Sequence, residues 1–342
     1  DIGDQSTTAG LLNNIANVQR QQGSVAEALK TYQASLAISR EIGDRTAVAL
    51  TLNNMAIGLR VQGDLAGAKK NYEEALAIRR AIGEKAGASA TLNNLANLMS
   101  DQGDLSGAMK LYEETRRTAE ELGDRRGVAM AWYNVGEMER LQGSLSSSRT
   151  SYDQALTLRR AIEDKSGVAR TLASIGLVQT AQARFSEARK TYEEALALLE
   201  SVGEKQGIAR VHNFIGTLSL HEGRPGDAQK LLRQAATEFQ ALKAADEHAA
   251  TLAVLAKALL AEGRNQEAEK TIQEALRLVA PTSNRQWHLE VGIAAGRVEA
   301  ATGKRAAAAA RLRKLRDDAK GFVGGGRDAP GALREGGGPP GR

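Results

Sequence analysis

The sequence contains no cysteine and few aromatic residues, and these shortages exclude several classes of protein. Without cysteine there can be no disulfide framework, no thiolate metal site and no cysteine nucleophile. Aromatic residues make up only 4% of the chain, although 42% of it is hydrophobic and alanine is abundant. This combination favours closely packed helices over a β-sandwich. No stretch approaches 18 consecutive apolar residues, so the sequence predicts no membrane-spanning helix.

The charge of the chain is unevenly distributed. The sequence pI is about 9.4, which would suit a protein that binds nucleic acid. Residues 304–342, however, hold ten Lys and Arg against four Asp and Glu, a net charge of +6. The preceding 303 residues therefore have a net charge of −1. A basic stripe along the chain, which phosphate binding would need, is not expected, and we predict no nucleic-acid partner.

Several residue types recur with a period of 40. One recurring position is glycine in seven of the eight units: Gly23, Gly63, Gly103, Gly143, Gly223, Gly263 and Gly303. In the remaining unit this position is Ala183. Five residues later stands a small residue: Ala28, Ala68, Ala108, Ser148, Ala188, Ala228, Ala268 and Ala308. Four residues after that stands a large one: Tyr32, Tyr72, Tyr112, Tyr152, Tyr192, Leu232, Ile272 and Leu312. Columns in phase over eight units identify a repeat protein.

Each unit is predicted to be a pair of antiparallel helices. Leu12, Ile15 and Ala16 have helical spacing before Gly23, and Ala28 and Tyr32 have it afterwards. Glycine suits the left-handed residue that ends a helix, and Asp64, Asp104, Ser24 or Ser144 can cap the next one. We therefore expect an all-α, right-handed solenoid of about eight hairpins, with units near 9–43, 49–83, 89–123, 129–163, 169–203, 209–243, 249–280 and 287–318.

These residues resemble the tetratricopeptide repeat family. Asn14-Ile15-Ala16-Asn17, followed by Gly23, Ala28 and Tyr32, matches the family pattern of Asn-Leu-Gly-Asn, Gly, Ala and Tyr, and the match extends over residues 9–318. The long units are similar to those of kinesin light chain, Pins-type adaptors and bacterial signalling proteins. The period is 40 instead of 34, and six extra residues add about 9 Å of helix. We expect the second helix of each hairpin to be longer than in the standard repeat.

Both ends of the chain depart from the repeat. Ile2-Gly3-Asp4 aligns with Ile42-Gly43-Asp44, so residues 1–8 are predicted to end the second helix of a preceding repeat in a longer protein. Residues 319–342 are rich in glycine and proline and are predicted to form a disordered tail. The helix before this tail, which includes the alanine run 306–310, is expected to act as a polar cap.

The resemblance implies a binding groove lined by the first helices. Carried over position by position, the predicted peptide-binding residues are Asn13, Asn17, Arg20, Asn53, Arg60, Asn93, Asn97, Tyr133, Glu137, Arg140, Arg170, Arg210 and Asn213. Asparagine can both donate and accept, so a row of asparagines can hold the backbone of an extended peptide. Arg20, Arg60 and Arg140 could then select acidic groups. Farther along, Leu177, Leu220 and Leu260 would suit an apolar anchor.

A purely structural interpretation of these residues stays open. The column Asn14, Asn54, Asn94 and Asn134 is expected to make hydrogen bonds between repeats. Asn13, Asn53 and Asn93 could contact a ligand or only water, and the arginines could be paired locally. Leu177 and Leu220 could be covered by neighbouring helices. Trp132 occupies the Leu12 column and is predicted to lie in the core.

No pattern of a catalytic or metal site stands out. The histidines His212, His221, His248 and His288 lack the spacing of a zinc helix, and carboxylate pairs such as Glu73-Glu74 recur with the repeat, as solvated helix faces do. We therefore expect no enzyme activity, metal or cofactor, and a cytoplasmic protein. The predicted function is a scaffold that binds a peptide or protein segment. The alternative is a regulatory or sensor segment of a larger bacterial signalling protein, either a protein kinase or a transcription regulator.

Overall fold

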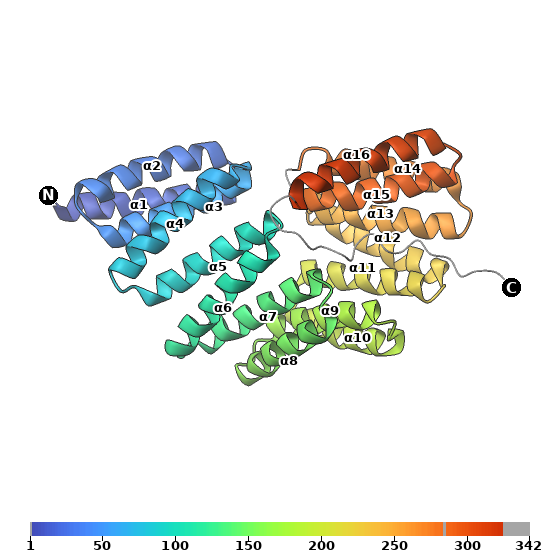
Figure 1. Ribbon diagram of the computed structural model, residues 1–342, viewed down its shortest axis with the longest axis horizontal. Helices are drawn as coiled ribbons and strands as arrows, with labels where there is room; N and C mark the ends of the chain where they lie inside the picture. The colour runs from blue at the N-terminus through green and yellow to red at the C-terminus, as the bar shows by residue number, and fades with distance from the viewer. Residues whose placement is uncertain (1, 283–284, 324–342) are drawn as a thin grey trace. The chain divides into compact units, whose positions relative to one another are not determined.

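The computed structural model describes residues 2–282 and 285–323 of the 342, and these residues form sixteen α-helices and no strand (Figure 1). The chain divides into two compact units, Asp1–Met138 and Glu139–Arg342, which are described separately below. The all-α architecture predicted from the repeat is confirmed. The helices of unit 1 are α1 (Ile2–Gln21), α2 (Val25–Glu41), α3 (Arg45–Gln62), α4 (Leu65–Ala81), α5 (Lys85–Asp101), α6 (Leu105–Glu121) and most of α7 (Arg125–Leu141).

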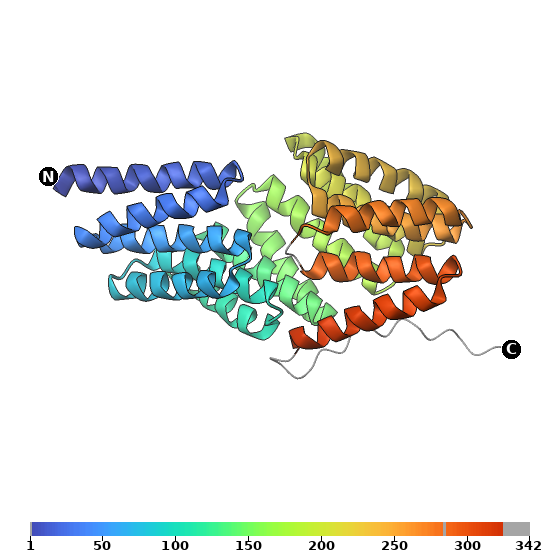
Figure 2. The ribbon, with the colours of Figure 1, turned by 90° about the horizontal axis from the view of Figure 1, so that it is seen from above.

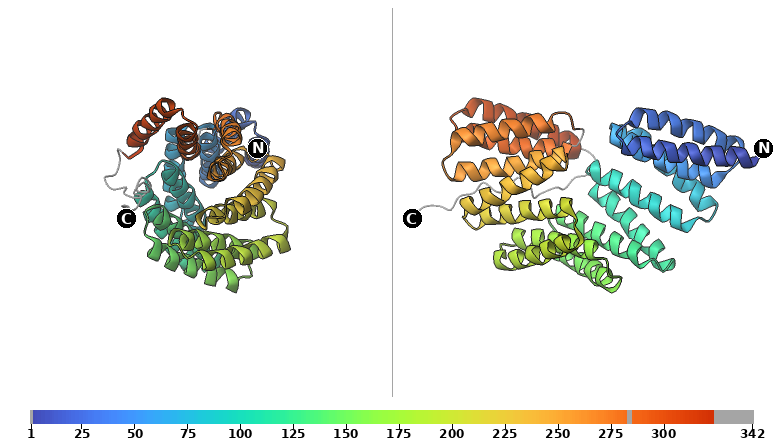
Figure 3. Two further views of the ribbon diagram at one scale, coloured as in Figure 1. Left: turned by 90° about the vertical axis from the view of Figure 1, so that its right-hand side faces the viewer. Right: turned by 180° about the vertical axis from the view of Figure 1, so that it is seen from behind.

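Unit 2 repeats the same pattern of helix, short turn and antiparallel helix. Its helices are α8 (Leu145–Ala161), α9 (Lys165–Ala181), α10 (Phe185–Val202), α11 (Lys205–His221), α12 (Pro225–Ala241), α13 (Ala245–Ala261), α14 (Asn265–Val279), α15 (Arg285–Ala301) and α16 (Arg305–Val323). In each unit the odd-numbered helices are the first helices of the hairpins and the even-numbered ones are the second. Figures 2 and 3 show the hairpins of each unit from further sides.

The turns between helices use a left-handed residue, as the glycine column predicts. Gly23 and Gly63 have φ of 87° and 90°, values that a residue without a Cβ adopts at little cost. The turn before the next hairpin is built in the same way, with Gly43 at 73°. Ala183 occupies the glycine position with φ of 57°, so this turn keeps its geometry at a steric cost.

Aspartate caps the helices that follow many of these turns. The carboxylate of Asp64 accepts the backbone N–H of Gly67 at 2.9 Å, and that of Asp104 accepts the N–H of Gly107 at 2.8 Å. Ser24 and Ser144 occupy the same position but make no side-chain capping bond, so that part of the capping prediction is wrong.

The predicted columns of small and large residues form the core of each unit. In unit 1, Ala56, Ala68 and Tyr72 of one hairpin are almost fully buried together. In unit 2, Gly176 lies against the ring of the buried Tyr192. The first helix of a hairpin packs against its own second helix, and that second helix packs against the first helix of the next hairpin, for example α3 with α4 and α4 with α5. Each hairpin therefore buries its apolar faces through its neighbours.

Two buried arginines connect successive hairpins. Arg79 on α4 donates from Nη1 to the hydroxyl of Thr91 on α5 at 2.9 Å, and burial lowers the pKa of this arginine. Arg159 on α8 donates from Nη1 to the hydroxyl of Thr171 and to the carbonyl oxygen of Gly167 on α9, both at 2.7 Å. A charge buried in this way stabilises the interface only because its hydrogen bonds are made.

The structure corrects two boundaries expected from the sequence and shows how each unit is divided. First and second helices have nearly equal lengths, 18 and 17 residues for α3 and α4. The turns lie 20 residues apart, as at Gly23 and Gly43, and they divide the extra residues equally between the two helices. Residues 2–8 belong to α1 and do not end a separate helix, because a continued helix satisfies their backbone groups. Helix α16 continues to Val323, five residues into the predicted tail. Residues 324–342 of that tail lie outside the described residues.

Candidate peptide-binding face

Asparagine side chains link successive first helices of unit 1. The Nδ2 group of Asn54 donates to Oδ1 of Asn13 at 3.1 Å, and Asn94 donates in the same way to Asn53, also at 3.1 Å. A third bond joins Asn134 to Asn93 at 3.0 Å. We call these three pairs the asparagine ladder. The predicted hydrogen bonds between repeats are thus confirmed, and their acceptors are the three residues proposed for ligand contact: Asn13, Asn53 and Asn93.

The ladder uses only part of the hydrogen-bonding capacity of its amides. Asn94 and Asn134 give one N–H each, while their Oδ1 atoms accept no hydrogen bond from the described residues. Asn93 accepts through Oδ1 and has no acceptor for its own Nδ2 group. Asn94, Asn134 and Asn93 are half-buried, whereas Asn13 and Asn53 are only 5% and 7% exposed. The ladder therefore fixes the register of the first helices and leaves donors and acceptors for another molecule.

Two of the predicted asparagines hold a buried tyrosine of their own hairpin. The hydroxyl of Tyr32 donates to Oδ1 of Asn17 at 2.6 Å, and that of Tyr112 donates to Asn97 at the same distance. The equivalent position in the hairpin between them is Ile57, which offers no acceptor. The hydroxyl of Tyr72 makes no hydrogen bond to any described residue, and burial raises its pKa to about 12 although Arg60 and Arg20 lower it.

The two predicted arginines of unit 1 differ in their surroundings. Arg60 forms an ion pair from Nε to Oδ2 of Asp101 at 2.5 Å, across to the next first helix. The side chain of Arg20 forms no ion pair or hydrogen bond with the described residues, and its Nε is buried without a partner. The two arginines look equivalent in the sequence, but Arg60 is neutralised by Asp101 and Arg20 has no counter-ion among these residues.

Helix α7 carries three further predicted residues. Tyr133, Glu137 and Arg140 are half-buried and all interact with other residues of the structure. The neighbouring Trp132 is also half-buried, and the guanidinium of Arg116 lies 4.7 Å from the centre of its ring. Trp132 therefore packs against α6 through a cation–π contact.

In unit 2 most of the predicted residues interact with other residues of the same unit. Asn213 donates to the hydroxyl of Thr251 at 2.8 Å. Arg170 and Arg210 lie 3.9 and 3.7 Å from carboxylate oxygens of Glu204 and Glu247. Leu220 and Leu260, expected as an apolar anchor, lie against the hydrophobic core, and Ala173 on α9 is only 6% exposed. These contacts favour a structural role for this half of the predicted site.

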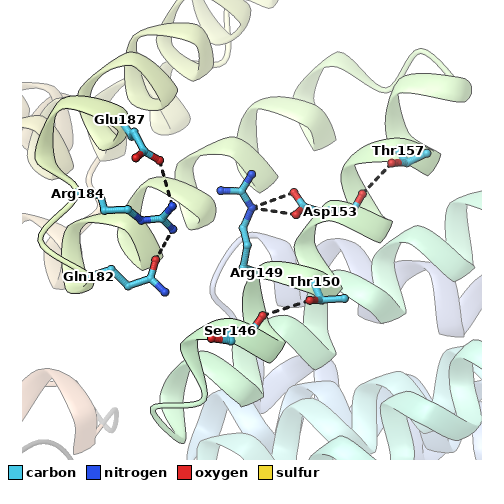
Figure 4. A network of polar contacts seen from close by, with 8 residues as sticks. All are labelled: Ser146, Arg149, Thr150, Asp153, Thr157, Gln182, Arg184 and Glu187. Carbon is cyan, nitrogen blue, oxygen red and sulfur yellow. Dashed lines mark hydrogen bonds and ion pairs between the residues drawn. The ribbon is translucent and has the colours of Figure 1, made fainter.

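The recurring carboxylates lie on the opposite, second helices. The second residue of three doublets forms an ion pair with an arginine of the preceding second helix: Arg40 with Glu74, Arg80 with Glu114 and Arg160 with Glu194. Figure 4 shows local pairs of the same kind in unit 2, where Arg149 pairs with Asp153 on α8 at 2.9 Å and Arg184 pairs with Glu187 at 3.1 Å. These groups are exposed, which confirms the prediction of solvated helix faces.

Two of the four histidines have polar partners within the structure. His212 is 8% exposed and its Nδ1 lies 2.9 Å from a carboxylate oxygen of Glu238, while Nε2 of His288 lies 2.9 Å from the carbonyl oxygen of Thr282. Residues 2–282 and 285–323 contain no group of three or more metal-ligating side chains. Within the same ranges, no helix combines the length and the apolar character that crossing a lipid bilayer would require.

Comparisons with known proteins agree with this fold. The family model described as tetratricopeptide repeat matches residues 7–81, 47–121 and 127–201, which together are more than half of the chain. A comparison with curated proteins gave no match. Many solved structures are similar, among them the following three. A Rap protein complexed with competence and sporulation factor has a TM-score of 0.61 and 14% identity, over 93% of this chain and 99% of its own.

Aspartyl phosphate phosphatase F from Bacillus subtilis has a TM-score of 0.66 and 11% identity, over 96% of this chain and 97% of its own. A signal transduction ATPase with a tetratricopeptide repeat sensor, from Pyrococcus horikoshii, has a TM-score of 0.58 and 16% identity, over 93% of this chain and 48% of its own. These likenesses show a shared fold. With its 40-residue hairpins and the family match across three segments, this chain belongs to the tetratricopeptide repeat family.

Proposed function

We propose that this chain binds an extended peptide or protein segment on the first-helix face of unit 1. By this face we mean the surface that carries the asparagine ladder, Asn17, Asn97, Arg20 and Arg60 on α1, α3, α5 and α7. Tetratricopeptide repeats form interaction or regulatory domains, and the proposal assigns that role to a particular surface. The expectation of a cytoplasmic protein stays a prediction.

The observation that carries this proposal is the half-used asparagine ladder. Two of the three amide pairs present free groups on half-buried side chains, a carbonyl on Asn94 and Asn134 and an amide N–H on Asn93, whereas Oδ1 of Asn54 accepts from Nδ2 of Asn53 at 3.5 Å. An extended backbone offers alternating N–H and C=O groups, which such a row can bind independently of sequence. Because the ladder bonds hold the amides in place, little side-chain entropy would be lost on binding.

The test begins with selection of random twelve-residue peptides on the full chain by display. Recovered peptides are synthesised with a fluorophore, and their dissociation constants are measured by fluorescence anisotropy. We expect the double change Asn53→Ala with Asn93→Ala to weaken binding by about tenfold or more, because the free amide N–H of Asn93 is removed and Asn94 loses the bond that holds its free carbonyl in place, each worth roughly 1 kcal/mol. The far-UV circular dichroism should stay helical.

The matched control lies on the second helices. Arg40→Ala with Arg80→Ala removes two exposed ion pairs, with Glu74 and Glu114, and should leave peptide affinity unchanged. The proposal is wrong if selection yields no peptide, or if both double variants weaken binding equally. Loss of helicity in the asparagine variant would assign those residues to structure alone.

A regulatory role is the second candidate. One similar structure is titled as an ATPase with a tetratricopeptide repeat sensor, and this chain matches 48% of it. Another is titled as a complex with competence and sporulation factor. In this role the same face would bind an effector or another domain of the parent protein. Sequencing of the gene upstream would support it by revealing kinase motifs or a winged helix, and a gene without a further domain would count against it.

A further inference from the structure

The ion pair between Arg60 and Asp101 shows how a carboxylate sits on the first-helix face of unit 1. Asp101 is 41 residues after Arg60 and lies at the end of the next first helix, α5, with its Oδ2 at 2.5 Å from Nε of Arg60. Its charge is close enough to Tyr112 to contribute to the raised pKa of that phenol, after the larger effect of burial. A carboxylate at this place therefore lies beside both an arginine and a tyrosine.

The preceding repeat has the arginine but lacks the carboxylate. The residue 41 positions after Arg20 is Val61, which is 58% exposed although it is apolar. No described residue forms an ion pair or hydrogen bond with the side chain of Arg20. Its side chain lies against α3, because a Cβ built at Gly58 would be 3.9 Å from its Cδ. The guanidinium is thus held next to the second hairpin without an acid to neutralise it.

The nearby tyrosine is also without a partner. Tyr72 is 1% exposed, and its hydroxyl has no acceptor among the described residues because Ile57 replaces the asparagine found at positions 17 and 97. Burial raises the pKa of Tyr72 most, while Arg60 and Arg20 lower it and Asp101 raises it. Two cations and one carboxylate therefore act on this phenol, and since Asp101 is already paired with Arg60, the charge of Arg20 is the one left without a counter-ion in the part of the chain that the structure describes.

We propose that the peptide bound by this face is acidic, and that one of its carboxylates occupies the place between Arg20 and Tyr72. The inference rests on the proposed function and adds the chemical class of its ligand. The guanidinium of Arg20 and the hydroxyl of Tyr72 donate to the carboxylate oxygens, and the exposed Val61 contacts the adjoining aliphatic atoms. An aspartate or glutamate side chain and a peptide C-terminus offer the same group.

The chain offers a direct test, which is to supply the missing carboxylate in cis. Val61→Asp copies the arrangement of Asp101 beside Arg60, and Val61→Asn is its uncharged control of equal size. Display-selected twelve-residue peptides are measured against the full chain and both variants. We expect Val61→Asp to lower affinity by about ten- to a hundredfold, and Val61→Asn to leave it within about threefold, because one charge-assisted contact is lost.

Two further arms identify the ligand group. Arg20→Gln should lower affinity as Val61→Asp does, and replacing Asp or Glu in the selected peptide by Asn or Gln should have no further effect on that variant. Peptides made with a free and with an amidated C-terminus distinguish a terminal carboxylate from a side chain. Asp101→Val should release Arg60 and raise the affinity of peptides with two acidic residues. Each variant is checked for native helicity by circular dichroism.

The two proposals fail in different ways. If no peptide is selected, or the asparagine variant binds normally, the proposed function itself is wrong. If peptides bind but carry no excess of Asp or Glu, or Val61→Asp binds them as well as Val61→Asn does, the acidic class is wrong and the peptide-binding face stands.

Discussion

The substitution Gly176→Ala tests whether close packing or helix propensity has the larger effect on the stability of unit 2. This glycine lies in α9 at the column where Ala16, Ala56 and Ala96 stand in unit 1. A Cβ built on Gly176 would approach Cε1 of Tyr192 most closely and would lie 2.7 Å from both Cδ1 and Cζ of the same ring. Since Tyr192 is fully buried, its ring has no solvent to move into.

Two opposing effects set the size of the change for Gly176→Ala. Alanine in a helix interior is more favourable than glycine by roughly 1 kcal/mol. Overpacking a core costs about 1–3 kcal/mol, and contact with three atoms of one buried ring places this site at the upper end. We therefore expect a net loss of about 1–2 kcal/mol of unfolding free energy. Urea denaturation followed by circular dichroism measures it, and hydrogen exchange in α9 and α10 localises it.

Gly10→Ala is the matched control for this experiment. Gly10 lies within α1, and a Cβ built there would meet nothing within 4 Å. Only helix propensity changes at this site, so we expect Gly10→Ala to raise the free energy of unfolding by about 1 kcal/mol. If Gly176→Ala stabilises the protein as much as Gly10→Ala does, the close approach of α9 to Tyr192 is refuted.

Three further changes test other features of the fold. Ala68→Leu should cost roughly 1–3 kcal/mol because Ala68 is fully buried in its hairpin, and an unchanged melting temperature would contradict the column assignment. Ala183→Gly should raise the urea midpoint by relieving a left-handed alanine with φ of 57°, a gain of up to about 1 kcal/mol, and a lower midpoint would argue against strain at this turn. Burial lowers the pKa of His248 below its ordinary value of 6.5, so stability should be full above pH 6.5 and fall as the pH drops below it. His248→Val should flatten this part of the curve measured by urea denaturation between pH 5 and 8, and an unchanged slope would exclude His248 as its cause.

Much of the fold can be predicted from the sequence alone because each 40-residue unit repeats the same local sequence signals. Helical periodicity, the left-handed glycine at Gly23 and its equivalents, and the column from Tyr32 onward predict hairpins and their turns without knowledge of any distance. The ladder column was predictable too, since an asparagine that recurs in register meets the preceding repeat at the same place in each hairpin, as Asn54 does at Asn13.

The tertiary structure decided which polar groups neutralise each other. Arg20 and Arg60 look alike in the sequence, and only the stacking of α3 on α5 shows that Asp101 pairs with Arg60 while Val61 leaves Arg20 unpaired. A 41-residue offset between arginine and aspartate was the available signal, but its meaning depends on how far one helix is shifted along the next. That shift is set by side-chain packing between hairpins, and it cannot be predicted from the repeat period alone.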